Sequence, residues 1–213
     1  NGKLFEPALI EAKAPVGYTF TGWRKSSGST IEVFGNHGTW KYYDRGQRSG
    51  TTWRTTSFND ASWNSGTAPL GYSMSGIHTT ISYGTNSQQK YPTTYFRKTF
   101  TLKDAPTMGD VFQLNYRVDD GCVIWVNGQE AGRVNMPAGT VSYTTFSTTY
   151  AGDTPMTGTI DLSPQLFRKG SNVIAVEVHN TSYTSSDLYW DGELRTSVGT
   201  SSDETILEDR IIS

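Results

Sequence analysis

The chain has 213 residues, a length that suits one large all-β domain with a short extra segment better than two full domains. The net charge is only −2 with no basic stripe, which argues against a nucleic-acid partner. The 6 Trp, 12 Tyr and 9 Phe can fill a core, and the 22 Gly with many Ser and Thr favour strands and turns over helices. No apolar run approaches the roughly 20 residues that a membrane-spanning helix needs.

The composition changes along the chain and predicts three parts. Residues 1–32 are an extra segment, a candidate remnant of a preceding module, because prolines interrupt it before any core pattern begins. Residues 33–198 form the main domain, and residues 199–213 a tail or linker. The chain starts at Asn1 without Met, which fits either a removed signal peptide or a fragment of a longer protein.

The main domain alternates apolar and polar residues in short runs separated by turn residues. This period of two is typical of strands, and the Asn127-Gly128 pair is a strong signal for a two-residue hairpin turn. The single cysteine, Cys122, lies in such a run and is interpreted as a small buried hydrophobe. The pattern predicts strands over residues 95–102, 114–119, 122–126, 129–134, 141–149, 157–162, 173–178 and 187–194. Strands spaced in this way predict an all-β jelly-roll β-sandwich.

Residues 34–91 are less regular and carry isolated aromatic side chains. Two interpretations stay open for them. The rings either pin long loops to the sandwich, or one or two of them form a platform on which a sugar stacks. The rings are Trp40, Tyr42, Tyr43, Trp53, Phe58 and Trp63.

Several segments resemble a known family over about residues 36–196. They are GTWKYYDRG (38–46), TTWRTTSFNDASWNSGTAPLGY (51–72), TTYFRKTFTL (93–102), YRVDDGCVIWVNGQEAGRVNMPAG (116–139), LFRKGSNVIAVEVHN (166–180) and SSDLYWDGEL (185–194). They resemble the galactose-binding-domain-like jelly rolls that occur as accessory modules in large secreted or surface bacterial proteins of Bacteroides type. They are also similar to the sugar-binding jelly roll of family 2 glycoside hydrolases. The resemblance implies a glycan or polysaccharide ligand, neighbouring domains in a larger chain and a structural calcium ion.

Six residues are candidates for ligand contact at the loop ends of the sandwich. Asp119 and Asp120 precede Gly121, where short carboxylates either cap a strand-ending bend or contact a ligand or cation. His179 closes a core strand and either fastens the loops of Asp119 or Asp187 or touches the ligand. The remaining three candidates are Arg133, Trp190 and Asp191.

These three offer the usual chemistry of sugar recognition. The ring of Trp190 can stack on a sugar face beside the hydrogen-bond acceptor Asp191, although Tyr189 and Trp190 alternate and only one of them can face the core. Arg133 either donates to hydroxyl or carboxylate groups or is a solvated arginine on a strand edge.

The function that these features favour is non-catalytic carbohydrate binding. The alternative is a structural or protein-interaction spacer without a glycan ligand, and a carbohydrate-active enzyme comes third, because no catalytic motif accompanies the scattered carboxylates. Calcium is implied by the resemblance alone. The loop acids that could contribute ligands are Asp44, Asp60, Asp153 and Asp187.

Overall fold

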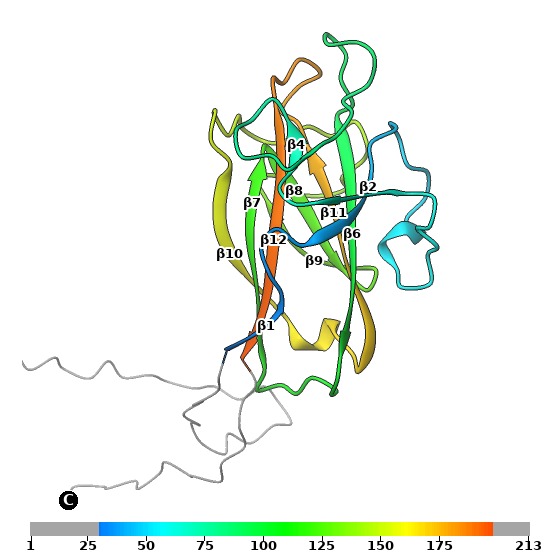
Figure 1. The fold of residues 1–213 in the computed structure, drawn as a ribbon, viewed down its shortest axis with the longest axis vertical. Coiled ribbons are helices and arrows are strands. Elements are labelled where there is room, and N and C mark those ends of the chain that lie inside the picture. Colours follow the sequence, from blue (N-terminus) through cyan, green and yellow to red (C-terminus); the bar gives the residue numbers. More distant parts are fainter. Residues whose placement is uncertain (1–29, 198–213) are drawn as a thin grey trace, which may run out of the picture. The chain divides into compact units, whose positions relative to one another are not determined.

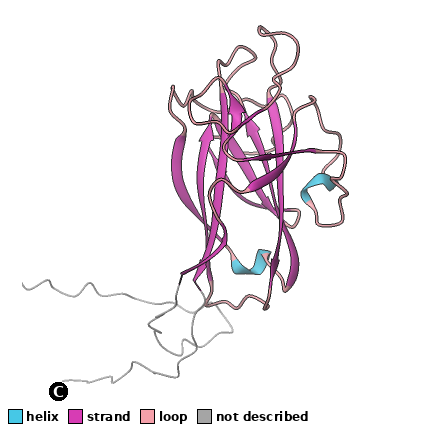
Figure 2. Cartoon of the chain, viewed as in Figure 1, coloured by secondary structure: helices cyan, strands magenta, loops and turns pink. Residues whose placement is uncertain are grey.

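A computed structural model describes residues 30–197, which form two β-sheets packed face to face (Figure 1). The strands dominate, and the two helices of this range are single 3₁₀ turns, η1 (Thr52–Arg54) and η2 (Pro164–Leu166) (Figure 2). The predicted all-β sandwich is therefore confirmed. The predicted tail and residues 1–29 of the predicted N-terminal segment lie outside the described residues. None of the helices between residues 30 and 197 has the length and apolar character needed to cross a membrane.

The first sheet has the strand order β10-β7-β12-β4-β5, and β1 also pairs with β12. Its pairs are antiparallel except β4 with β5. The strands are β1 (Thr30–Phe34), β4 (Leu70–Tyr72), β5 (Thr79–Thr80), β7 (Val111–Asp119), β10 (Met156–Leu162) and β12 (Leu188–Ser197). Because β1 starts at Thr30, the sheet includes three residues that the sequence assigned to the N-terminal segment.

The second sheet is entirely antiparallel, with the order β3-β2-β6-β11-β8-β9. Its strands are β2 (Thr39–Tyr43), β3 (Asn64–Thr67), β6 (Thr93–Leu102), β8 (Gly121–Val126), β9 (Gln129–Val134) and β11 (Gly170–His179). The Asn127-Gly128 pair joins β8 to β9 with φ values of 52° and 93°, as the hairpin prediction requires.

The main core lies between the sheets and follows the predicted alternation. Along β11, Ile174, Val176 and Val178 point into it, so Ala175 and Glu177 point outward. The core is rich in rings, and Trp40 meets Trp190 edge to face at a centroid distance of 5.4 Å. The predicted burial of Cys122 is confirmed.

A second, smaller cluster covers the outer face of the second sheet. Its buried members are Trp53, Trp63, Tyr95 and Ala175, and the half-buried rings of Tyr43, Phe58, Trp125 and Tyr143 pack against them. Trp53 and Trp63 belong to the irregular region between β2 and β4, so these two rings pin a long loop to the sandwich. The central strands of this sheet are thus covered on both faces.

The predicted strand over residues 141–149 is wrong, because this segment is a loop. The Thr145 N–H donates to the Ser142 carbonyl at 3.0 Å, and the Ser142 N–H donates to the Thr145 hydroxyl at 2.9 Å. Local bonds of this kind satisfy the backbone in place of a strand ladder. The loop that results crosses the outer face of the second sheet and forms one wall of the site described next.

Candidate functional site

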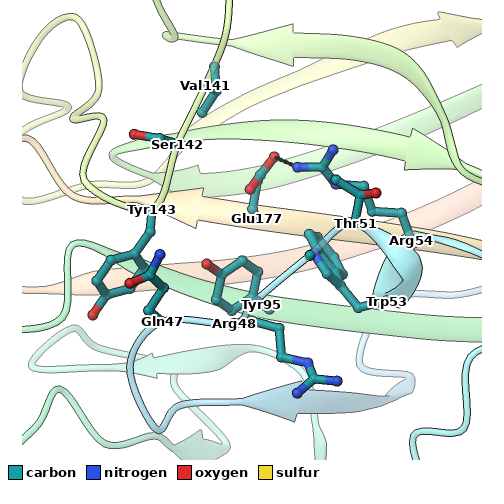
Figure 3. A pocket seen from close by; sticks show the side chains of 11 residues that line it. Gln47, Arg48, Thr51, Trp53, Arg54, Tyr95, Val141, Ser142, Tyr143 and Glu177 are labelled. Carbon is teal, nitrogen blue, oxygen red and sulfur yellow. Dashed lines mark hydrogen bonds and ion pairs between the residues drawn. The ribbon is translucent and has the colours of Figure 1, made fainter.

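A cavity of about 220 Å³ opens on the outer face of the second sheet (Figure 3). Its floor comes from β6 and β11, which contribute Tyr95 and Glu177. One wall is the loop that contains η1, and the opposite wall is the loop of residues 141–143. The other lining residues are Gln47, Arg48, Gly50, Thr51, Trp53, Arg54, Val141, Ser142 and Tyr143.

Arg97 on β6 holds the η1 loop against the sheet. Its side chain is only 2% exposed and donates through Nε to Asp60 Oδ2 at 2.8 Å. Its Nη1 donates to the carbonyls of Trp53 and Thr55. The arginine therefore uses both ends of its guanidinium to fix the segment that carries the Trp53 wall.

Glu177 is the buried charge of the cavity. Its Oε1 accepts from Trp125 Nε1 at 3.0 Å and from Arg54 Nη2 at 3.2 Å. The Arg54 guanidinium lies 3.7 Å from the centroid of the Trp125 ring, so the three side chains form one packed group. Burial raises the pKa of Glu177, and the neighbouring Arg54 charge opposes this shift.

Two phenols face the same space. Burial raises the pKa of Tyr95 and raises that of Tyr143 to about 12. Both hydroxyls are therefore protonated at neutral pH and can serve as donors, while Glu177 supplies an acceptor. Figure 3 shows the carboxylate and the rings of Trp53, Tyr95 and Tyr143 around one space.

The loop that carries the wall of residues 141–143 is fastened to the sheet by two side chains. The Thr93 hydroxyl donates to the Tyr143 carbonyl at 2.6 Å. His179 Nδ1 lies 2.7 Å from the Thr145 carbonyl, which can only accept, so Nδ1 carries the proton. Burial lowers the pKa of His179 to about 4, and the ring is neutral at pH 7. The loop-fastening interpretation of His179 thus fits the structure, but the fastened loop is that of Thr145 and not that of Asp119 or Asp187.

His179 also lies next to the acid of the cavity. Its Nε2 has no hydrogen-bond partner among residues 30–197 and lies 3.8 Å from Glu177 Oε2. His179 is not one of the lining residues. It therefore positions the wall of the cavity and borders its acid.

Asp120 ties two loops together at the end of the sandwich where β7 passes into β8. Its carboxylate accepts from the N–H groups of Ala151 at 3.0 Å and Thr181 at 2.8 Å, and from the Ser185 hydroxyl at 3.1 Å. This is the capping role that the sequence left open beside ligand contact. The carboxylate is fully buried, and both of its oxygens accept hydrogen bonds from the protein.

Asp119 is also fully buried, but neither of its carboxylate oxygens has a hydrogen-bond partner within the described residues. Burial, together with the charges of Asp120 and Asp187, raises its pKa to about 8. The carboxyl group is therefore mostly protonated at neutral pH.

Trp190 is not available to a sugar, and the expectation of a stacking ring at this position is wrong. The side chain is fully buried, with Trp40 against it and Phe96 at a centroid distance of 6.2 Å. Its neighbour Tyr189 is only 2% exposed. The physical reason is that β12 lies inside its sheet, between β7 and β4, and its inward residues belong to the main core.

The last two predicted residues lie away from the cavity lining. Asp191 is fully buried on the first sheet and accepts from the backbone N–H groups of Gly192 at 2.9 Å and His37 at 3.4 Å. Arg133 on β9 pairs with Glu130 and donates to a backbone carbonyl, which fits a strand-edge arginine. The structure therefore does not gather the six predicted residues into one site.

The sequence did not predict that the residues lining the cavity would come together in one site. A signal existed for Glu177, because an acid on the outward side of an otherwise apolar strand must find a partner or water. Trp53 was one of the six rings for which a sugar-stacking platform was left open, but nothing in the sequence pairs it with Arg54 or places it at β11, because only the folded loop brings the two residues there.

Acidic side chains alone do not form the calcium site that the family resemblance implies. Within residues 30–197 no three His, Cys, Asp or Glu side chains lie together in an arrangement that could hold a metal ion. The candidate loop acids have protein partners instead. Asp44 accepts from the Ser82 N–H at 2.7 Å, and Asp153 accepts from the Tyr150 hydroxyl at 2.9 Å.

Comparison with known proteins relates the sandwich to parts of large glycoside hydrolases. No protein-family model matches the sequence, and no curated protein matches it. Beta-glucuronidase 2 of Bacteroides uniformis is similar over 80% of this chain and 18% of its own, with 17% identity and a TM-score of 0.51. A family 2 glycosyl hydrolase of Bacteroides cellulosilyticus is similar over 76% of this chain and 20% of its own, with 21% identity and a TM-score of 0.50.

The match thus spans about a fifth of each of these hydrolase chains. At such identities the likeness shows the fold alone. The chain contains a β-sandwich of the kind that forms one part of family 2 glycoside hydrolases.

Proposed function

We propose that this sandwich is a non-catalytic carbohydrate-binding accessory module, of galactose-binding-like type, in a larger secreted or surface bacterial protein. The observation that carries the proposal is the cavity around Glu177. It combines the half-buried ring of Tyr143, the buried acceptor Glu177 and two phenol donors, which are groups that recognise a sugar ring and its hydroxyls, while Trp53, only 1% exposed, closes one wall. The volume of about 220 Å³ lies just below the roughly 300 to 1,000 Å³ of pockets for drug-sized ligands. A space of this size suits one sugar residue.

The chemistry of the cavity favours binding over catalysis. A glycosidase uses two carboxyl groups that flank the scissile bond. Of the described residues that line the cavity, Glu177 alone is acidic. A tyrosine acting as the base of a lyase needs a lowered pKa, whereas burial raises the pKa values of both Tyr95 and Tyr143.

The accessory role rests on the fold. Sandwiches of this kind occupy about a fifth of the Bacteroides hydrolase chains, beside the rest of those proteins. A module that holds a glycan would keep a neighbouring domain close to it and raise the effective concentration of the attached partner. Secretion or surface display is part of the same proposal, since extracellular glycans are the intended ligands.

A glycan-array screen of the purified chain, in calcium buffer and again with chelator, tests the proposal. Any hit is titrated by Trp fluorescence, because Trp53 and Trp125 lie at the cavity. Glu177→Gln removes the charged acceptor and should weaken binding about tenfold or more, as expected for hydrogen bonds to an ionised group. Glu130→Gln, at an exposed acid on β9, is the matched control and should leave binding unchanged. If no plant, host or bacterial glycan binds, the result would favour a structural spacer or protein-interaction module instead.

A further inference from the structure

A pair of aromatic rings, one exposed and one half-buried, lies outside the cavity lining. Tyr183 is 37% exposed, and Phe146 is half-buried against it. Their ring centroids are 5.0 Å apart with an interplanar angle of 89°, so one ring meets the other edge to face. The exposed fraction of Tyr183 leaves part of its ring open to solvent.

Both rings are carried by backbone that is fixed on each side. The loop of Tyr183 is anchored by the Asp120 carboxylate, which accepts from Thr181 before it and Ser185 after it. The Tyr183 carbonyl also accepts from the Lys90 N–H at 2.9 Å. An exposed ring on a backbone held at three points loses little conformational freedom when a ligand covers it.

Phe146 is held in a similar way. The residue before it, Thr145, is bonded to His179, and the N–H of the residue after it, Ser147, donates to the Asn180 carbonyl at 3.0 Å. His179 and Asn180 lie at the end of β11, the strand that supplies Glu177 to the cavity.

The ring pair continues from the cavity wall. Phe146 follows the wall residue Tyr143 by three positions, so their Cα atoms are at most about 11 Å apart. Tyr183 is close enough to Tyr143 that its phenol, after burial and the Tyr91 phenol, contributes to the raised pKa of Tyr143. Tyr143 at the cavity wall, followed by Phe146 on the same loop and by its partner ring Tyr183, defines an aromatic path from the cavity to the loop end.

We propose that the ligand is a glycan chain of several sugar residues, with one residue in the Glu177 cavity and the next residues on the Phe146–Tyr183 pair. This inference rests on the proposed function and deepens it, because it names a chain and not a free monosaccharide as the ligand. A glycan bound along this path would also account for the ring pair being carried by backbone that hydrogen bonds hold in place. The buried residues Asp120 and His179 become positioning residues that hold the outer part of the site.

Calorimetric titration with matched ligands of different length tests the inference. The probes are glucose, mannose, galactose and xylose, each with its β-1,4-linked tetrasaccharide. The tetrasaccharide of the preferred sugar should bind at least about tenfold more tightly than its monosaccharide, a difference of about 1.4 kcal/mol. Tyr183→Ala should remove most of that gain and leave the monosaccharide affinity unchanged. Tyr150→Ala is the matched control, an exposed tyrosine outside the path that should change neither affinity.

The outcomes separate this inference from the proposed function. If monosaccharide and tetrasaccharide bind equally, or if Tyr183→Ala leaves the tetrasaccharide affinity intact, the extended site is wrong while sugar binding in the cavity stands. If no probe binds, the proposed function fails and the extended site fails with it. Circular dichroism of Tyr183→Ala checks its fold, which should be intact because the ring that is removed is exposed.

Discussion

Replacement of Arg97 by methionine is the perturbation that tests most directly how the candidate site is built. Arg97 lies on β6 under the η1 loop and donates to Asp60 and to two backbone carbonyls. Methionine keeps much of the length and apolar stem of the side chain but donates no hydrogen bond. The expected result is a less stable domain whose η1 loop separates from the sheet, together with weaker ligand binding because the Trp53 wall moves with the loop.

The expected loss of folding free energy depends on the groups that lose Arg97 as their hydrogen-bond donor. Removing one partner of a buried ion pair costs about 3 to 5 kcal/mol, but Asp60 is 23% exposed and can recover water, which lowers the cost. Two carbonyls lose a charged donor, at about 1 to 3 kcal/mol each if they stay buried. A loss of about 3 kcal/mol is therefore expected. For a domain of this size it corresponds to a fall in Tm of about 6 to 12 °C.

The assay combines urea unfolding with amide hydrogen exchange. Arg168→Met is the matched control, because Arg168 also donates to the η1 loop, at Thr56, but is exposed, and exposed pairs contribute less than about 1 kcal/mol. Exchange over residues 51–60 should accelerate in Arg97→Met and stay unchanged in the control. The reasoning is refuted if the two variants are equally stable, or if Arg97→Met loses stability without faster exchange in this loop.

Three further predictions concern buried groups outside the cavity lining. Trp190→Ala should cost about 3 to 5 kcal/mol in urea unfolding, as for other large core residues, so any loss of binding it causes reflects unfolding. Asp119→Asn should stabilise the domain at high pH. The pKa of Asp119 is about 8 in the folded chain and 3.8 in the unfolded chain, so the wild type loses stability as the pH rises from about 4 to 8. The variant has no carboxyl group at this position and does not lose that stability. The advantage should grow from pH 4 to pH 9. A pH effect of His179 is expected in the Asp119→Asn variant. Its free energy of unfolding should fall by about 2 kcal/mol from pH 6.5 to 4.5, because His179 is protonated in the unfolded chain but, with a pKa of about 4, stays neutral in the folded chain. Adding His179→Gln should remove this dependence on pH.

The strands of the sandwich were largely predictable because their signals are local. The alternation over residues 173–178 specifies both the strand and the direction of each side chain, and Glu177 points outward as that pattern requires. The Asn127-Gly128 turn likewise needs only two residues that tolerate positive φ. The prediction failed at residues 141–149, where β-forming residues alternate but Ser142 and Thr145 close a local turn.

The site was less predictable because its contacts are between distant segments. The alternating pattern of a strand predicts that Tyr189 and Trp190 point to opposite faces of the sheet. It does not predict that other parts of the chain cover both faces at this position. The assignment of a binding ring to Trp190 failed for this reason. Trp53 and Glu177 are 124 positions apart, and their meeting depends on how the η1 loop folds over the sheet.

The position of the cavity follows from how far this loop reaches over the sheet. An outward face that carries Arg97 and Glu177 on adjacent strands must be solvated or covered by groups that satisfy both charges. The loop satisfies Arg97 with Asp60 and two carbonyls, and it satisfies one oxygen of Glu177 with Arg54. Coverage ends there, between the η1 loop and the loop of residues 141–143, where the cavity opens beside the carboxylate. The bonds that stabilise the loop therefore also form the site, so a change at Arg97 should alter stability and binding together.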